Sequence, residues 1–166
     1  SDPGCGKTFY IRHLIKTIPD KNFVYLPSSI ATKIIDPSFL TFALAYLQNS
    51  VLVIEDAELI LTKRGKIGNN SEVSTLLNLT DGLMKDALNL KIICTANCQM
   101  SDIDEALLRK GRILSKYEFK NLSLEKTNQL IRKKGDYESD VPLSLADCFN
   151  ISETGFAKKR VPVGYR

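Results

Sequence analysis

Ser1-Asp2-Pro3-Gly4-Cys5-Gly6-Lys7-Thr8 opens the chain and matches all but the first position of the phosphate-loop pattern G-x-x-x-x-G-K-[ST]. A polyphosphate needs several backbone N–H groups converging on it, and Gly4 and Gly6 let the main chain approach without a Cβ in the way. Lys7 adds a positive charge at the outer phosphates, and Thr8 offers a hydroxyl to Mg²⁺. We therefore expect Pro3, Gly4, Cys5, Gly6, Lys7 and Thr8 to bind a nucleotide.

The residues after this loop predict a helix whose N-terminus favours an anion. Apolar residues recur there at helical spacing, namely Phe9, Ile11, Leu14, Ile15 and Ile18. Ser1 stands where the pattern has its first glycine, and no apolar strand precedes the loop. We expect the first strand to be missing from this chain and the chain to be part of a longer protein. Taken alone, residues 4–8 also fit a glycine-rich turn before a helix.

Composition limits the class of protein. The 166 residues are 43% apolar and 25% charged, which is ordinary for a globular protein with a real core. The net charge of +4 is too small to argue for nucleic acid as the partner. The four cysteines are mostly far apart, His13 is the only histidine, and no run reaches the roughly 18 apolar residues of a membrane span. We expect reduced thiols, no zinc site, no membrane span and an intracellular, cytoplasmic location.

The order of elements predicts an α/β protein. Short apolar or β-branched runs predict strands at residues 22–26, 51–54, 91–95 and 117–119. Helical spacing of apolar residues predicts helices, which we place at residues 37–48, 57–62, 71–82, 103–109, 123–131 and 143–149. Lys63 to Asn70 is polar and glycine-rich and predicts a loop.

Polar side chains follow two of these strands. The run Val51–Ile54 suits a strand buried on both faces of a parallel sheet, and it ends on Glu55 and Asp56. Acids at that edge indicate a Walker B arrangement, in which one acid holds Mg²⁺ and the other orients the attacking water. Asn97 follows the next strand, where its amide is able to bond the γ-phosphate and the water. In isolation the acids fit a helix cap equally well, and Asn97 fits a turn.

Two arginines close a short amphipathic helix. Arg109 and Arg112 lie three residues apart around Gly111, on one face or at the immediate end of residues 103–109. Such a pair is well shaped to complete the phosphate site of a neighbouring subunit, and it fits surface charge equally well.

Taken together, these motifs resemble the AAA+ ATPases, and more closely the AAA branch that includes the mitochondrial Rieske-protein translocase and similar bacterial proteins. The resemblance rests on residues 4–8, 51–56, 76–78, 81–83, 95–97 and 106–112. It implies a P-loop NTPase fold, a five-stranded parallel sheet flanked by helices with a small helical lid. The α/β nucleotide-binding core would occupy residues 1–121 and a partial lid residues 122–166.

The resemblance also implies ATP and Mg²⁺ as cofactors and a homo-oligomer, commonly a hexameric ring. By position Thr8, Glu55 and Asp56 would hold the metal. Catalysis would fall to Glu55, Asp56, Asn97, Arg109 and Arg112, with both arginines acting as fingers toward the next subunit.

Four departures limit this transfer. The acids stand in the order Glu55 then Asp56 instead of Asp then Glu, and Lys110 replaces a common proline. The segment between Pro27 and Pro37 has no aromatic residue, so threading of polypeptide by an aromatic paddle does not follow. No lid arginine matches a second sensor, although Arg132 and Arg160 are available.

The leading hypothesis is an ATPase that remodels or moves a macromolecule, with protein favoured over nucleic acid as the substrate. The swapped acids keep open a second hypothesis, a nucleotide-dependent assembly scaffold with little hydrolysis. A small-molecule kinase or GTPase is a third. Thr62-Lys63-Arg64-Gly65 lacks the aspartate of a guanine motif.

Overall fold

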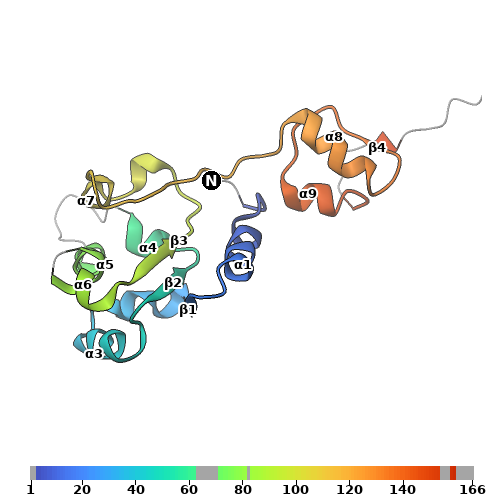
Figure 1. Ribbon diagram of the computed structural model, residues 1–166. Coiled ribbons are helices and arrows are strands. Elements are labelled where there is room, and N and C mark those ends of the chain that lie inside the picture. The colour runs from blue at the N-terminus through green and yellow to red at the C-terminus, as the bar shows by residue number, and fades with distance from the viewer. Residues whose placement is uncertain (1–2, 63–70, 82, 154–157, 160–166) are drawn as a thin grey trace, which may run out of the picture. The chain divides into compact units, whose positions relative to one another are not determined.

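The computed structural model describes residues 3–62, 71–81, 83–153 and 158–159 (Figure 1). The chain divides into two compact units, which are described separately below. Unit 1 is Ser1–Phe9 with Glu118–Arg166, and unit 2 is Tyr10–Tyr117. The predicted loop at residues 63–70 lies outside the described residues. The division at residues 121 and 122 stays a prediction.

Unit 2 is built on a parallel sheet with the strand order β1-β2-β3 (Figure 1). The strands are β1 (Asn22–Leu26), β2 (Ser50–Ile54) and β3 (Lys91–Cys94). In the register Leu26 lies opposite Ile54, and Ile54 lies opposite Cys94. The central strand β2 is buried along its whole length. The three strands predicted at these positions are therefore confirmed.

Helices cover both faces of this sheet. On one face Ile11 of α1 (Lys7–Thr17) packs against Val51, Val53 and their neighbours. On the other face Leu52 and Ile54 join the main core. That core is lined by α2 (Ser28–Ala31), the 3₁₀ helix η1 (Thr32–Ile35), α3 (Pro37–Tyr46), α4 (Glu58–Leu61), α5 (Ser71–Thr80) and α6 (Leu83–Leu88). Alternate residues of β2 thus face opposite helical layers, as the continuous apolar run predicts.

Polar caps define several helix starts. The Asp36 carboxylate accepts a hydrogen bond from the Ser38 N–H at the start of α3, and Pro37 occupies the first turn. The Asp104 carboxylate caps α7 (Glu105–Leu108) by accepting from the Ala106 N–H. The 3₁₀ helix η2 (Met100–Asp102) precedes α7 and begins with a capping box.

The C-terminal part of unit 1 has its own small core. α8 (Leu124–Arg132) follows the cap Ser123, and α9 (Leu145–Phe149) follows the cap Ser144. Both predicted helices are present, and the second begins two residues later than predicted. Between and beyond them β4 (Tyr137–Glu138) pairs antiparallel with β5 (Lys158–Lys159). The buried side chains of this core are Ile131, Leu143, Cys148 and Ile151.

Some predictions from the sequence are wrong. Tyr117-Glu118-Phe119 does not form a strand. Tyr117 instead stacks on Tyr10 with a ring-centroid distance of 6.4 Å. Residues 28–35, where no element was predicted, form α2 and η1, and α6 and β4 were not predicted either. The described residues of unit 2 hold three parallel strands where the resemblance implied five.

Candidate functional site

Thr95 joins the carboxyl ends of β2 and β3. Its N–H donates to the Ile54 carbonyl at 3.0 Å, and its carbonyl accepts from the Ala57 N–H at 2.8 Å. Its hydroxyl also accepts from the Asp56 N–H at 3.1 Å. These three bonds fix the turn that carries Glu55 and Asp56. Each of them joins Thr95, the residue after β3, to the last residue of β2 or to the turn that follows it.

Asp56 and Asn97 are brought together at this edge. The Asn97 Nδ2 donates to Asp56 Oδ1 at 3.2 Å, and both side chains are exposed. Asp56 adopts a left-handed backbone with a φ of 51°, which is uncommon for a residue with a Cβ. The turn therefore holds this carboxylate in a defined direction, beside an amide that comes from the neighbouring strand.

Glu58 belongs to the same constellation, although sequence reasoning missed it. Its carboxylate accepts a hydrogen bond from the Asn97 N–H. Glu58 opens α4 and is half-buried, as is Glu55, which precedes Asp56 directly. The position of Glu58 in the sequence could have indicated this contact. Glu58 lies four residues after the end of β2, close to the edge of the sheet at which β3 also ends.

The two arginines have different surroundings. The Arg112 Nη1 donates to the Ala106 carbonyl at 2.7 Å, and its Nε lies 3.7 Å from a carboxylate oxygen of Asp81. Arg112 therefore folds back over α7 of its own chain. Arg109 is exposed, and its side chain makes no ion pair or hydrogen bond within the part of the chain that the structure describes.

The phosphate loop lies in unit 1. Gly4 and Gly6 have φ values of 74° and 100°, the left-handed region in which a Cβ is disfavoured. Lys7 and Thr8 begin α1, as expected for such a loop, whereas Pro3 is exposed and Cys5 is buried.

The loop and the acids belong to different units. Within unit 2 the structure brings Asp56, Asn97 and Glu58 together. That the loop joins them around one nucleotide is part of the proposed function below.

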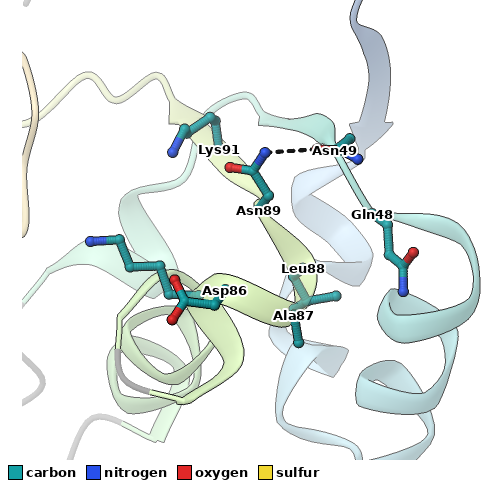
Figure 2. Close-up of a pocket in the computed structure, with 8 residues that line it drawn as sticks. Gln48, Asn49, Asp86, Ala87, Leu88, Asn89 and Lys91 are labelled. Atoms are coloured by element: carbon teal, nitrogen blue, oxygen red, sulfur yellow. Dashed lines mark hydrogen bonds between the residues drawn. The ribbon is translucent and has the colours of Figure 1, made fainter.

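A pocket of about 330 Å³ lies at the opposite, amino end of β2 and β3 (Figure 2). Asn49 and Asn89 border it, both with positive φ, and Asn89 Nδ2 donates to Asn49 Oδ1 at 2.7 Å. Lys85 and Lys91 also line it. The predicted catalytic residues are not among its lining residues.

The cysteines of unit 2 are poor nucleophiles. Burial raises the pKa of the Cys94 thiol to about 12. Burial also raises the pKa of Cys98, and the carboxylates of Glu58 and Asp102 add to this shift. All four cysteines are free thiols, and the described residues contain no group of three or more His, Cys, Asp or Glu side chains able to hold a metal. Thiolate chemistry therefore has no support here.

A parallel α/β sheet with acids at its carboxyl edge, together with a glycine loop that opens a helix, defines the class of P-loop NTPases. Residues 1–121 match the model of the ATPase family associated with various cellular activities (AAA), and the chain belongs to that family. The comparison with curated proteins gave no match. The branch of the family stays a prediction. Among the described residues, no helix combines the length and apolarity that crossing a membrane requires.

Proposed function

We propose that this chain is an ATP-binding and ATP-hydrolysing module that works as a ring and drives the remodelling or movement of a macromolecule. The observation that carries the proposal is the contact between Asp56 and Asn97 at the carboxyl ends of two parallel strands. Nδ2 of Asn97 donates to Oδ1 of Asp56 at 3.2 Å. A carboxylate and an amide in such contact supply an acceptor and a donor for one water molecule.

The residues present fit a magnesium nucleotide. The positive φ angles of Gly4 and Gly6 make the cradle in which backbone N–H groups are able to face phosphate oxygens. Lys7 and Thr8 would hold the phosphates and the metal, with Glu55 supplying a carboxylate on the metal side. Magnesium, when bound, neutralises charge that develops on the phosphate oxygens.

Asp56 would receive the proton of the attacking water while Asn97 fixes the orientation of that water. The new bond joins the water oxygen to the γ-phosphorus, and the bond from that phosphorus to the bridging oxygen of ADP breaks. Glu58 would act through Asn97, because its carboxylate fixes the backbone that carries this amide.

Arg109 is the better candidate for a finger that acts on a neighbouring subunit. Its side chain is exposed, whereas Arg112 already bonds to Ala106 and lies close to Asp81 in its own chain. A finger stabilises charge in the transition state, an effect of order 10³–10⁵ in rate. Turnover would then require assembly, which fits a ring of identical subunits, commonly six.

Hydrolysis is tested with Asp56→Asn, which keeps the side-chain volume and removes the proton acceptor. We expect ATP to bind with nearly unchanged affinity in the presence of Mg²⁺ and turnover to fall by about 10²-fold or more. Asp20→Asn, at an exposed turn, is the matched control and should turn over normally. Normal hydrolysis by Asp56→Asn would refute the assignment. Tight ATP binding with negligible turnover by the unmodified chain would favour an assembly scaffold.

A further inference from the structure

The first turn of α9 contacts the phosphate loop within unit 1. The Ala146 N–H donates to the Gly4 carbonyl at 2.9 Å, although the two residues are far apart in the sequence. Ala146 occupies the second position of α9, where a helix leaves its own N–H groups without a partner inside the helix. The loop therefore satisfies an amide that α9 has to bond elsewhere.

The glycines of the loop permit a close approach of α9. A Cβ placed on Gly4 would lie 3.0 Å from the Ala146 Cβ and 3.3 Å from the Ser144 hydroxyl. A Cβ placed on Gly6 would lie 3.0 Å from Cδ2 of Leu145. A Cβ at Gly4 would therefore be crowded by α9, and a Cβ at Gly6 would require the flexible end of Leu145 to shift, in addition to the strain of a positive φ at both positions.

Two further contacts join the loop to the rest of unit 1. The Cys5 Sγ lies 3.5 Å from Oδ1 of Asn121, whose Nδ2 reaches the Pro142 carbonyl at 3.5 Å. Phe9 stacks on Phe149 at the other end of α9, with ring centroids 6.5 Å apart. The loop is therefore held at its start, at its middle and just after its end.

The direction of the hydrogen bond shows that α9 supports the loop. Phosphate binding uses backbone N–H donors of the loop, whereas α9 uses a carbonyl acceptor of Gly4. A contact that consumed the donors would compete with a nucleotide. The bond from Ala146 uses none of the loop N–H groups, and it fixes the peptide between Gly4 and Cys5.

We propose that Leu145 and Ala146 of α9 are positioning residues that hold the phosphate loop in its nucleotide-binding conformation. This inference rests on the proposed function, because it concerns the affinity of the same loop for ATP. It makes nucleotide affinity depend on how the first turn of α9 meets Gly4 and Gly6.

Ala146→Pro tests the hydrogen bond directly. Proline is tolerated in the first turn of a helix and removes the N–H that reaches Gly4, while it also restricts the backbone of the residue before it. Glu125→Pro is the matched control, because Glu125 occupies the same second position of α8 and is exposed. A second pair keeps the backbone intact, with Leu145→Ala as the test and Leu124→Ala as its control.

The measurements on the full chain are the dissociation constants for ATP and for inorganic tripolyphosphate, the thermal midpoint, and hydrogen exchange of residues 4–8. We expect Ala146→Pro to weaken binding of both ligands by about fivefold or more, the change that one net hydrogen bond makes. Exchange of the loop amides should quicken in Ala146→Pro and stay unchanged in Glu125→Pro. Leu145→Ala should weaken binding more than Leu124→Ala does.

Two results would overturn the inference. If the unmodified chain binds ATP and each test variant binds it as tightly as its control, the inference fails while the proposed function stands. If the unmodified chain does not bind ATP with Mg²⁺, the proposed function fails and the inference fails with it.

Discussion

The different surroundings of the two arginines predict different effects on stability. Arg112→Ala removes the 2.7 Å bond from a guanidinium to the carbonyl of Ala106 in α7. It also removes the ion pair with Asp81, whose side chain is 55% exposed. Arg109→Ala removes no contact of this kind within the described residues.

The magnitude follows from these contacts. A hydrogen bond that involves a charged group contributes about 1.5–3 kcal/mol, and the lower part of that range applies because the Arg112 side chain is 25% exposed. The exposed ion pair adds about 0–1 kcal/mol. We therefore expect Arg112→Ala to lower the free energy of unfolding by about 2 kcal/mol. Arg109→Ala should change it by less than about 0.5 kcal/mol.

Equilibrium urea unfolding of the unmodified chain and both variants measures this difference. Arg112→Lys adds a second comparison, because an ammonium cannot reproduce the planar fork and should recover only part of the loss. Equal stability of Arg109→Ala and Arg112→Ala would refute the reasoning, because it would mean that the contacts of Arg112 with Ala106 and Asp81 contribute nothing to the fold.

Three further predictions concern single side chains. Asn97→Ala should leave ATP affinity within a few-fold and lower turnover by about 10²-fold, since it removes a fixed donor beside Asp56; steady-state kinetics checks this. For Cys94, the unfolded thiol ionises above about pH 9 while the folded thiol stays neutral up to about 12. Stability should therefore fall as pH rises through this window, by up to about 1.4 kcal/mol per pH unit, and less steeply in Cys94→Ala, which alkaline urea titrations measure. Thr127→Val should cost about 1–2 kcal/mol in urea unfolding, because the buried hydroxyl accepts from the Leu143 N–H at 3.2 Å; a smaller cost than in Thr75→Val, where the threonine is only partly buried, would contradict this.

The sheet of unit 2 was predictable because each strand carries its own signal. Val51 to Ile54 is uniformly apolar, and a parallel strand buried on both faces needs that pattern. Tyr117-Glu118-Phe119 places two aromatic residues on either side of an acid, a composition that strands tolerate, yet it forms no strand, because a strand also needs a neighbour with which to exchange hydrogen bonds. Local sequence does not encode that neighbour.

The sequence predicted the meeting of Asp56 and Asn97, but not the contacts made by Ala146 and Arg112. Asp56 and Asn97 follow adjacent parallel strands, so their meeting at one edge follows from topology. The contact of Ala146 with Gly4 joins residues at opposite ends of the chain, and the turn of Arg112 onto Ala106 depends on tertiary packing. Neither has a signal in the spacing of residues.

The central claim is that a catalytic site needs Asp56 from one subunit and Arg109 from the next. We expect Asp56→Asn and Arg109→Ala each to be inactive alone, and measuring the ATP turnover of their mixture tests this claim most directly. Random assembly restores an intact Asp56 beside an intact Arg109 in about one site in four. The account predicts turnover of about a quarter of the unmodified rate in the mixture, rising steeply with protein concentration. A mixture as inactive as its components, or turnover by the unmodified chain that is strictly proportional to protein concentration at every dilution, would contradict it.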